Sequence, residues 1–175
     1  IMAASKVIET VKGIRYEILS EEHHDKVVQR FSEVWTTANS VTTALGITLE
    51  EHLKISDFYV KRGIETGVSF VAICEKTNEL AAFLLFADCY YNPRLVPRGR
   101  EEEFGEKLTT HSNFLYDLEF NNEFMKDYKI TKPKTVMRGI GGGVEKEYRG
   151  YSIFANLTRI MDEVHAKLGV KLGIE

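Results

Sequence analysis

A glycine-rich segment followed by an arginine turn is the part of the sequence with the clearest chemical meaning. Four of the five residues at positions 139–143 are glycine, and Arg149 lies in the turn that follows. Glycine is unfavourable in a strand because it costs backbone entropy and packs no side chain, so this many suggest that something else lies against the main chain. A turn that opens a helix presents free N–H groups, which with a nearby arginine could bind phosphate oxygens. The alternative is an ordinary strand–turn–helix connection with an exposed arginine, and the residues alone do not separate the two.

This turn needs a strand before it and a helix after it. Segment 153–168 repeats apolar residues at three- and four-residue spacing, which is typical of one face of an amphipathic helix, and Gly169 supplies a stop. The apolar positions are Ile153, Leu157, Ile160, Met161, Val164 and Leu168. We therefore expect residues 145–152 to connect the glycine strand to the start of this helix.

Few other residues form a pattern typical of catalysis or metal binding. Cys74 and Cys89 lie in apolar, strand-like runs without a histidine or second cysteine at ligand spacing. We therefore expect reduced core cysteines and no metal site. His23 and His24 stand at the start of a predicted helix, where solvated side chains are expected. His111 could act as a base, but a lone histidine at a segment boundary is expected at the surface.

The composition indicates one globular domain spanning residues 1–175. The chain is 43% hydrophobic and 28% charged, which is ordinary for such a domain. Its 23 Lys and Arg against 26 Asp and Glu give a net charge of −3, so no positive field attracts nucleic acid. No apolar run approaches membrane-spanning length and the first residues lack the layout of a signal peptide. We expect a cytoplasmic protein without a nucleic-acid or membrane partner.

Apolar periodicity predicts the elements around the turn. Residues 14–19 alternate as a half-buried first strand, and the runs 68–75 and 80–91 form a hairpin around residues 76–79. Three further helices are expected. The first is capped by Ser20 and has an apolar stripe of Val27, Val28, Phe31, Val34, Trp35 and Ala38. The second follows a capping box at Thr48 and faces inward with Leu49, Leu53 and Phe58. The third spans about 112–128 and has a stripe of Phe114, Leu118, Met125 and Tyr128, flanked by Leu115 and Phe124.

The order of these elements argues against two common phosphate-binding folds. A dinucleotide-binding fold needs its glycine turn after the first strand, whereas here the glycines come late. A P-loop needs Gly-Lys-Ser/Thr after the glycines, and that motif is missing.

The segment VEKEYRGYSIFANLTRIM resembles the acetyl-CoA signature of the GNAT N-acetyltransferase superfamily. In that family a central strand leads into an Arg/Gln-x-x-Gly-x-Gly/Ala turn whose amides hold the pyrophosphate. Arg149 stands at the family arginine, while Ser152 and Phe154 stand at the two small positions and depart from them. The resemblance implies acetyl-CoA as co-substrate, bound by Gly142, Gly143, Val144, Arg149, Gly150, Tyr151, Ser152, Ile153 and Phe154.

A second segment, ANSVTTALGITLEEHLKISDFYV, resembles a region of invertebrate arylalkylamine N-acetyltransferases that reads roughly Glu-Pro-Leu…Leu-Gly. Asn39 stands where that family has a glutamate proposed as the catalytic base, and Ser40 stands at the proline. The resemblance implies that Asn39 and Ser40 lie near the acceptor, although an ordinary turn role for Asn39 is an equal alternative. An asparagine cannot accept a proton, so the catalytic residues stay unassigned. A water chain to another carboxylate or histidine, a different acceptor, or weak catalysis would each account for this difference.

The resemblance also implies a fold. It is an α/β protein of three layers, with a mixed, mostly antiparallel central sheet flanked by helices. The last residues, GVKLGIE, read as the start of that family's fifth strand. The sequence is therefore expected to lack the family's C-terminal part, or to be completed by a second chain or in a homodimer.

The implied activity is direct transfer of an acetyl group from acetyl-CoA to a primary amine, with a small arylalkylamine as the expected acceptor. Two alternatives stay open: acetylation of proteins or peptides, and a non-catalytic module that binds acyl-CoA. None of the three requires a metal.

Overall fold

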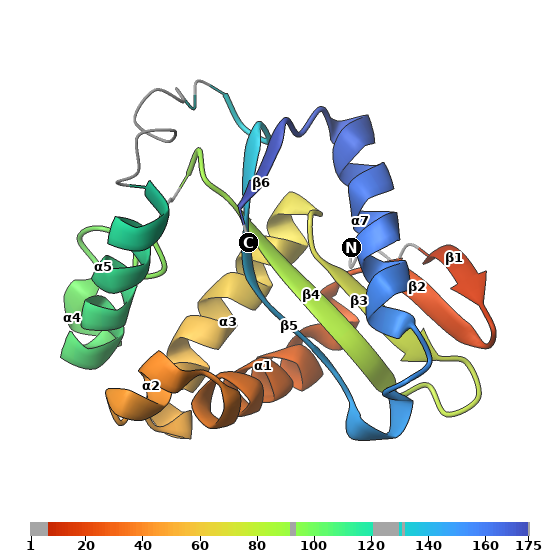
Figure 1. The fold of residues 1–175 in the computed structure, drawn as a ribbon, viewed down its shortest axis with the longest axis horizontal. Coiled ribbons are helices and arrows are strands. Elements are labelled where there is room, and N and C mark those ends of the chain that lie inside the picture. Colours follow the sequence, from red (N-terminus) through yellow and green to blue (C-terminus); the bar gives the residue numbers. More distant parts are fainter. Residues whose placement is uncertain (1–6, 92–93, 121–129, 131, 175) are drawn as a thin grey trace.

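Six strands form one sheet in the order in which they occur in the sequence (Figure 1). The computed structural model describes residues 7–91, 94–120, 130 and 132–174. Neighbouring strands are antiparallel from the first to the fifth, and the last pair is parallel. This confirms the expected mixed, mostly antiparallel sheet. The strands are β1 (Val7–Val11), β2 (Ile14–Ile18), β3 (Phe70–Cys74), β4 (Leu80–Asp88), β5 (Val136–Val144) and β6 (Leu172–Ile174).

Helices cover both faces of this sheet (Figure 1). Alternate strand residues contribute to two separate cores, as the period of two of a strand requires. One core lies under α1, α3, α4 and α5, and the other lies under α7 alone. The helices are α1 (His24–Ala38), α2 (Ser40–Ala44), α3 (Leu49–Thr66), α4 (Glu101–Phe104), α5 (Glu106–Phe120) and α7 (Ile153–Leu168), with single turns η1 (Glu21–His23) and η2 (Lys146–Tyr148).

Most of the expected elements are confirmed. The hairpin of β3 and β4, the helix that ends at Gly169 and the late glycine strand all form as the sequence predicts. The capping box at the start of α3 also forms, because Glu51 N donates to Thr48 Oγ1 and Thr48 N donates to Glu51 Oε2. The segment taken as the first strand is in fact the second, because β1 precedes it as an edge strand.

The helix expected at 112–128 begins earlier, at Glu106. Its predicted stripe is wrong, because Phe114 and Leu118 are 45% and 61% exposed. The buried face instead carries Leu108, His111 and Ser112, and Ser112 Oγ accepts a hydrogen bond from Val96 N at 2.8 Å. Polar residues thus occupy positions that apolar periodicity cannot identify. Phe124, Met125 and Tyr128 lie outside the described residues.

Three other apolar stripes are shifted at their ends. Ala38, expected in the buried stripe of α1, is exposed. Leu49 and Leu168, both expected to face inward, are 38% and 39% exposed. Each of these residues is the first or last of its helix.

The glycines of β5 are explained by close packing on both faces of the strand. A Cβ at Gly141 would lie 2.6 Å from Phe31 Cε2 and 2.7 Å from Trp35 Nε1, and a Cβ at Gly142 would lie 2.9 Å from Leu84 Cδ1. The expectation that something lies against this backbone is therefore met by aromatic and aliphatic side chains. The register also shifts at this point, since Leu85 pairs with Gly141 and Phe86 with Gly139.

The parallel pairing of β6 stops short of these glycines. β6 pairs with Val136, Met137 and Arg138 of β5. Within the part of the chain that the structure describes, the rest of that edge, from Gly139 to Val144, has no strand beside it. Its backbone groups are therefore available to another extended chain.

Replacing Gly141 by Ala should lower the free energy of unfolding by roughly 1–3 kcal/mol, because Phe31 and Trp35 must move to admit the methyl group. Gly173→Ala in β6 is the matched control, since nothing lies within 4 Å of its added Cβ. Urea unfolding of both variants checks this. Equal midpoints for the two would show that α1 does not depend on the bare strand.

Candidate functional site

The turn between β5 and α7 exposes a row of backbone N–H groups. After β5, the chain passes through η2 to Arg149 and then turns with Gly150 at φ 85° and Ser152 at φ 59°, before α7 begins at Ile153. The Ser152 side chain does not cap the helix. Consequently the first N–H groups of α7 are not satisfied by a capping side chain.

The amides of this turn have no partner in the described chain. Hydrogen bonds to backbone carbonyls resume at Asn156 N, which donates to Ser152 O at 3.0 Å. For the N–H groups of residues 150–155, no acceptor is found among the described residues. A cavity of about 340 Å³ lies over them, lined by Val144, Tyr148, Arg149, Gly150, Ser152, Ile153, Phe154 and Ala155. Free amides at the positive end of a helix dipole, next to a cavity, form a site that fits an anion.

Arg149 lies at the rim of this cavity with an exposed side chain. Its Nε donates to Val144 O at 3.3 Å, which directs the guanidinium back over the end of β5. For its two terminal nitrogens, no acceptor is found among the described residues. The arginine therefore has donors available for a second anionic oxygen.

The structure brings together most of the predicted cofactor residues, but not all. Val144, Arg149, Gly150, Ser152, Ile153 and Phe154 line the cavity over the turn. Tyr151 is 69% exposed and lines a different cavity, together with Tyr16 and Tyr148. Gly142 and Gly143 lie behind the turn in β5, where the Phe154 ring would be 3.2 Å from a Cβ at Gly142. The bulky residue at a position where the family has a small one is thus accommodated because β5 is bare there.

Asn39, predicted near the acceptor or in a turn, is the N-cap of α2. Its Oδ1 accepts hydrogen bonds from Thr42 N at 2.9 Å and from Thr42 Oγ1 at 3.1 Å. Ser40 is the exposed first residue of that helix. The turn role of Asn39 is thus realised, and its acceptor role stays a prediction.

Replacing Asn39 by Ala should lower the free energy of unfolding by about 1 kcal/mol, because the N–H of Thr42 loses its cap. Asn39→Asp keeps an oxygen at the same place and should be nearly neutral. Thermal unfolding of the two variants checks this, and similar losses for both would show that the cap contributes little.

The sequence analysis missed a buried histidine pair around Trp35. His52 and His111 are both 0% exposed, so the expectation of a surface position for His111 is wrong. The Trp35 ring packs against both, with centroid distances of 5.4 Å to His52 and 5.2 Å to His111. The three residues come from α3, α1 and α5, so only the packing of these helices reveals the cluster. No local sequence signal could have identified it.

Burial keeps both imidazoles neutral. It lowers the pKa of His52 to about 4, with a smaller contribution from the charge of His111. It lowers the pKa of His111 to about 4 as well, with help from the Arg138 guanidinium. At neutral pH each ring therefore carries one proton and one lone pair.

This pair makes stability sensitive to acid. The pKa of both groups lies below the ordinary value of 6.5, so the unfolded chain binds more protons between about pH 6.5 and 4. The free energy of unfolding is therefore not reduced by these histidines above this window, and it falls as the pH drops through it. Each histidine should lower the free energy of unfolding by about 2 kcal/mol at pH 5 relative to pH 7. Urea unfolding at pH 7 and pH 5 should show a loss that is smaller by about this amount in His111→Gln, and an unchanged loss in this variant would contradict the neutral buried state.

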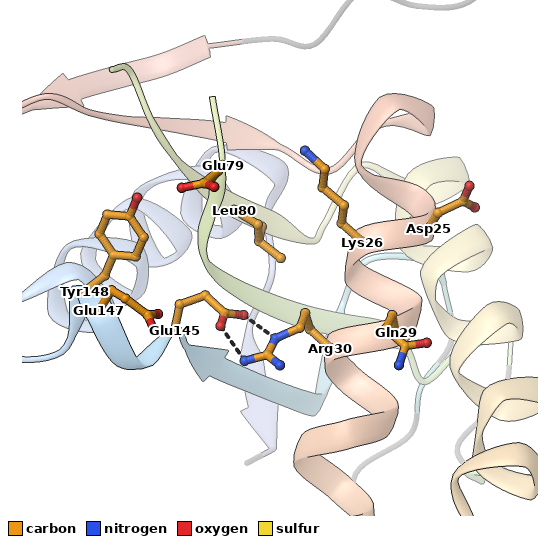
Figure 2. Close-up of a pocket in the computed structure, with 9 residues that line it drawn as sticks. All are labelled: Asp25, Lys26, Gln29, Arg30, Glu79, Leu80, Glu145, Glu147 and Tyr148. Atoms are coloured by element: carbon orange, nitrogen blue, oxygen red, sulfur yellow. Dashed lines mark hydrogen bonds and ion pairs between the residues drawn. The ribbon is translucent and has the colours of Figure 1, made fainter. Parts of the chain in front are cut away.

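A wider cavity of about 690 Å³ lies between α1 and the end of β5. Figure 2 shows Arg30 of α1 reaching across it to both carboxylate oxygens of Glu145, the residue that follows β5. Arg30 also pairs with Glu33. The cavity is lined by charges of both signs, Asp25, Lys26, Arg30, Glu79, Glu145 and Glu147, with Gln29, Leu80 and Tyr148. The Arg30–Glu145 ion pair attaches the start of the turn to α1.

His23 is buried, with 7% exposure, so its expected solvation is also wrong. Its Nδ1 accepts from Ser20 N at 3.2 Å, and burial lowers its pKa. His23, Glu17 and Glu22 bring potential metal-ligating atoms within 4.8 Å of one another. Arg15 Nε already donates to Glu17 at 2.8 Å, and this cation weakens the attraction of the cluster for a metal ion.

Both cysteines are free thiols, in agreement with the prediction. Cys89 is buried, whereas Cys74 is partly exposed. Hydrogen bonds from Thr77 and Tyr148 lower the pKa of Cys74 to about 7.

Within the described residues, no helix has the length and apolar character to cross a membrane.

Comparisons with known proteins identify the fold. No protein-family model matches the sequence, and no curated protein does. Solved structures do match. Arylalkylamine N-acetyltransferase 2 from Aedes aegypti aligns with a TM-score of 0.70 at 18% identity, over 90% of this chain and 73% of that one. The C-terminal condensation domain of Ebony, in complex with beta-alanyl-dopamine, aligns with a TM-score of 0.67 at 14% identity, over 89% of this chain and 70% of that one.

A third match is a mosquito protein assigned as arylalkylamine N-acetyltransferase 7, also from Aedes aegypti. It aligns with a TM-score of 0.61 at 12% identity, over 97% of this chain and 73% of that one. The structural alignments establish the architecture. At identities this low they do not establish the chemistry, which is argued from the residues of this chain. The chain therefore has the GNAT-like fold found in the arylalkylamine N-acetyltransferases, as its sequence resemblance implied.

Proposed function

We propose that this protein is an N-acetyltransferase that transfers an acetyl group from acetyl-CoA to a primary amine. One observation carries the proposal: the amides of residues 150–155 have no acceptor in the described part of the chain, border a cavity at the positive end of α7 and lie beside Arg149. This arrangement suits a diphosphate, which is the most highly charged part of the coenzyme's backbone. The fold shared with known acetyltransferases supports the same interpretation.

The residues of the chain also suit the rest of the coenzyme. The pantetheine arm carries amides, and the edge of β5 from Gly139 to Val144 offers backbone groups without a neighbouring strand in the described chain. An arm lying along that edge would pair with it as an added strand does. When bound, acetyl-CoA supplies an activated acyl carbonyl, and an N–H near Val144 would polarise the carbonyl oxygen.

The acceptor is proposed to be a small arylalkylamine. The solved neighbours are described as arylalkylamine N-acetyltransferases, and the Ebony domain is described in complex with beta-alanyl-dopamine. In this chain the partly buried Trp35 and Asn39 lie one helical turn apart at the end of α1, where an aromatic ring and an amide are close together. Holding amine and acyl donor together would supply much of the rate.

A non-catalytic acyl-CoA-binding module is the second candidate. It is favoured by one observation, namely that Asn39 offers no carboxylate and uses its side-chain oxygen as a helix cap. Both functions predict binding of acetyl-CoA, and only the first predicts turnover. Acetylation of peptides is a third possibility, which differs in the acceptor alone.

Thiol release from acetyl-CoA separates these functions. The protein is incubated with acetyl-CoA and arylalkylamines, polyamines or lysine peptides, and free thiol is measured with a chromogenic disulfide after the protein's own two cysteines have been subtracted. Release that depends on an arylalkylamine supports the proposal. Thiol release with peptides alone would show that the acceptor is a protein or peptide. Binding of acetyl-CoA without thiol release would identify the non-catalytic module.

Replacing Arg149 by Ala should weaken acetyl-CoA binding by about 1–3 kcal/mol, because a charged hydrogen bond to the diphosphate is lost. Arg159→Ala is the matched control, since Arg159 lies on α7 but pairs with Glu9 and Glu163 away from the turn. Titration calorimetry measures both. Equal affinity for Arg149→Ala and the wild-type protein would remove the turn from the binding site.

A further inference from the structure

Three ring nitrogens in the core under α1, α3 and α5 have no hydrogen-bond partner among the residues that the structure describes. They are Nε2 of His52 and both nitrogens of His111, and both side chains are 0% exposed. A buried polar atom without a partner costs free energy, so proteins keep one mainly where water, a ligand or a reaction uses it. These nitrogens therefore mark a place where a polar molecule is expected.

The place lies one ring below the surface, next to the proposed acyl site. Trp35, which packs against both imidazoles, is itself only partly buried. Its Nε1 lies 2.7 Å from where a Cβ of Gly141 would be, at the point of β5 where the pairing with β6 has ended. Asn39 follows one helical turn later, and its N–H donates to Trp35 O. A movement of the indole ring would thus connect the histidines to the open edge of β5.

The two histidines are not equivalent. Ser32 Oγ donates to Ser56 Oγ at 2.6 Å, and Ser56 Oγ lies 2.9 Å from His52 Nδ1. If the chain of donors continues, Ser56 donates to Nδ1 and the proton of His52 stays on Nε2. His111 has no such restraint, so either nitrogen can carry its proton. The charged or titratable groups that act on it are Arg138 from β5 and His52 from α3.

On the basis of the proposed function, we propose that the cluster of Trp35, His52 and His111 receives the acceptor amine, and that a ring nitrogen of His111 takes up the proton that the ammonium must lose. An aromatic amine would pack against the edge of the indole, and its nitrogen would reach the imidazole nitrogens that have no partner among the described residues. Burial and the Arg138 guanidinium lower the pKa of His111, so its ring is neutral with a lone pair for this proton and would hold the proton only transiently.

The step balances as follows. The ammonium gives one proton to His111, and the resulting neutral amine forms a C–N bond to the thioester carbonyl carbon. The C–S bond then breaks with its electron pair on sulfur, and the new amide nitrogen loses a second proton. One of the two protons neutralises the thiolate, and the other returns to solvent.

The test compares His111→Gln with His165→Gln. His165 is a second buried histidine, on the opposite face of the sheet, where its Nε2 contacts Val68 O and its ring packs on Phe70 and Phe86. With saturating acetyl-CoA and 2-phenylethylamine, kcat should fall at least about 100-fold in His111→Gln and stay within about threefold in His165→Gln. The Kd for acetyl-CoA should be unchanged in both. A kcat within threefold of wild type for His111→Gln overturns the proposal.

A second measurement needs no variant. Trp35 is the only tryptophan in the chain, so its emission reports directly on the cluster. Amines that are acetylated should change this emission in the wild-type protein, and an acetylated amine that leaves it unchanged overturns the site. If the protein binds acetyl-CoA but acetylates no amine, the proposed function fails and with it the proton transfer. In that case an emission change on adding amine would retain the binding site alone, and no change would remove it.

Discussion

The contact between α1 and the bare backbone of β5 is the constraint on which the rest of the structure depends. Phe31 and Trp35 approach Gly141 so closely that a single methyl group would displace them. This approach determines how deep α1 lies on the sheet, and Trp35 in turn packs against both His52 and His111. The same strand then ends in the turn with free amides. One stretch of glycines therefore supports both the helix packing on one face and the phosphate-sized cavity at the strand end.

The two halves of the proposed site obey opposite physical requirements. In the proposed function the N–H groups of the turn are open to a doubly charged group, and a helix start provides such groups without any side chain. The histidine cluster is excluded from water, which keeps its rings neutral. The Arg30–Glu145 ion pair ties α1 to the residue that precedes the turn, so the two regions share a mechanical connection.

Much of the fold could be predicted from the sequence, because strand alternation, helix periodicity, capping boxes and glycine stops are local signals. The β3–β4 hairpin, α7 and the turn at Arg149 all have such signals. The buried positions of His111 and Ser112 do not, because they depend on which face of α5 meets α1 and α3. The glycines of β5 predict that another group lies against the strand but not which one, because the aromatic rings that do so come from a helix more than a hundred residues earlier in the chain. The role of Asn39 at the acceptor lies beyond both sequence and fold, since a helix cap and a binding residue require the same side chain.

The order of the strands also bears on how the protein is made. Each of the first three pairings joins strands that are neighbours in the sequence, and two of these are short hairpins, so they can form while the later chain is still on the ribosome. The fourth pairing must wait until the long excursion between Asp88 and Val136 has been synthesised. Until β5 arrives, the aromatic face of α1 has no bare strand to rest on. The nascent chain therefore displays an incomplete core for much of its synthesis, and the glycine strand is the piece that closes it.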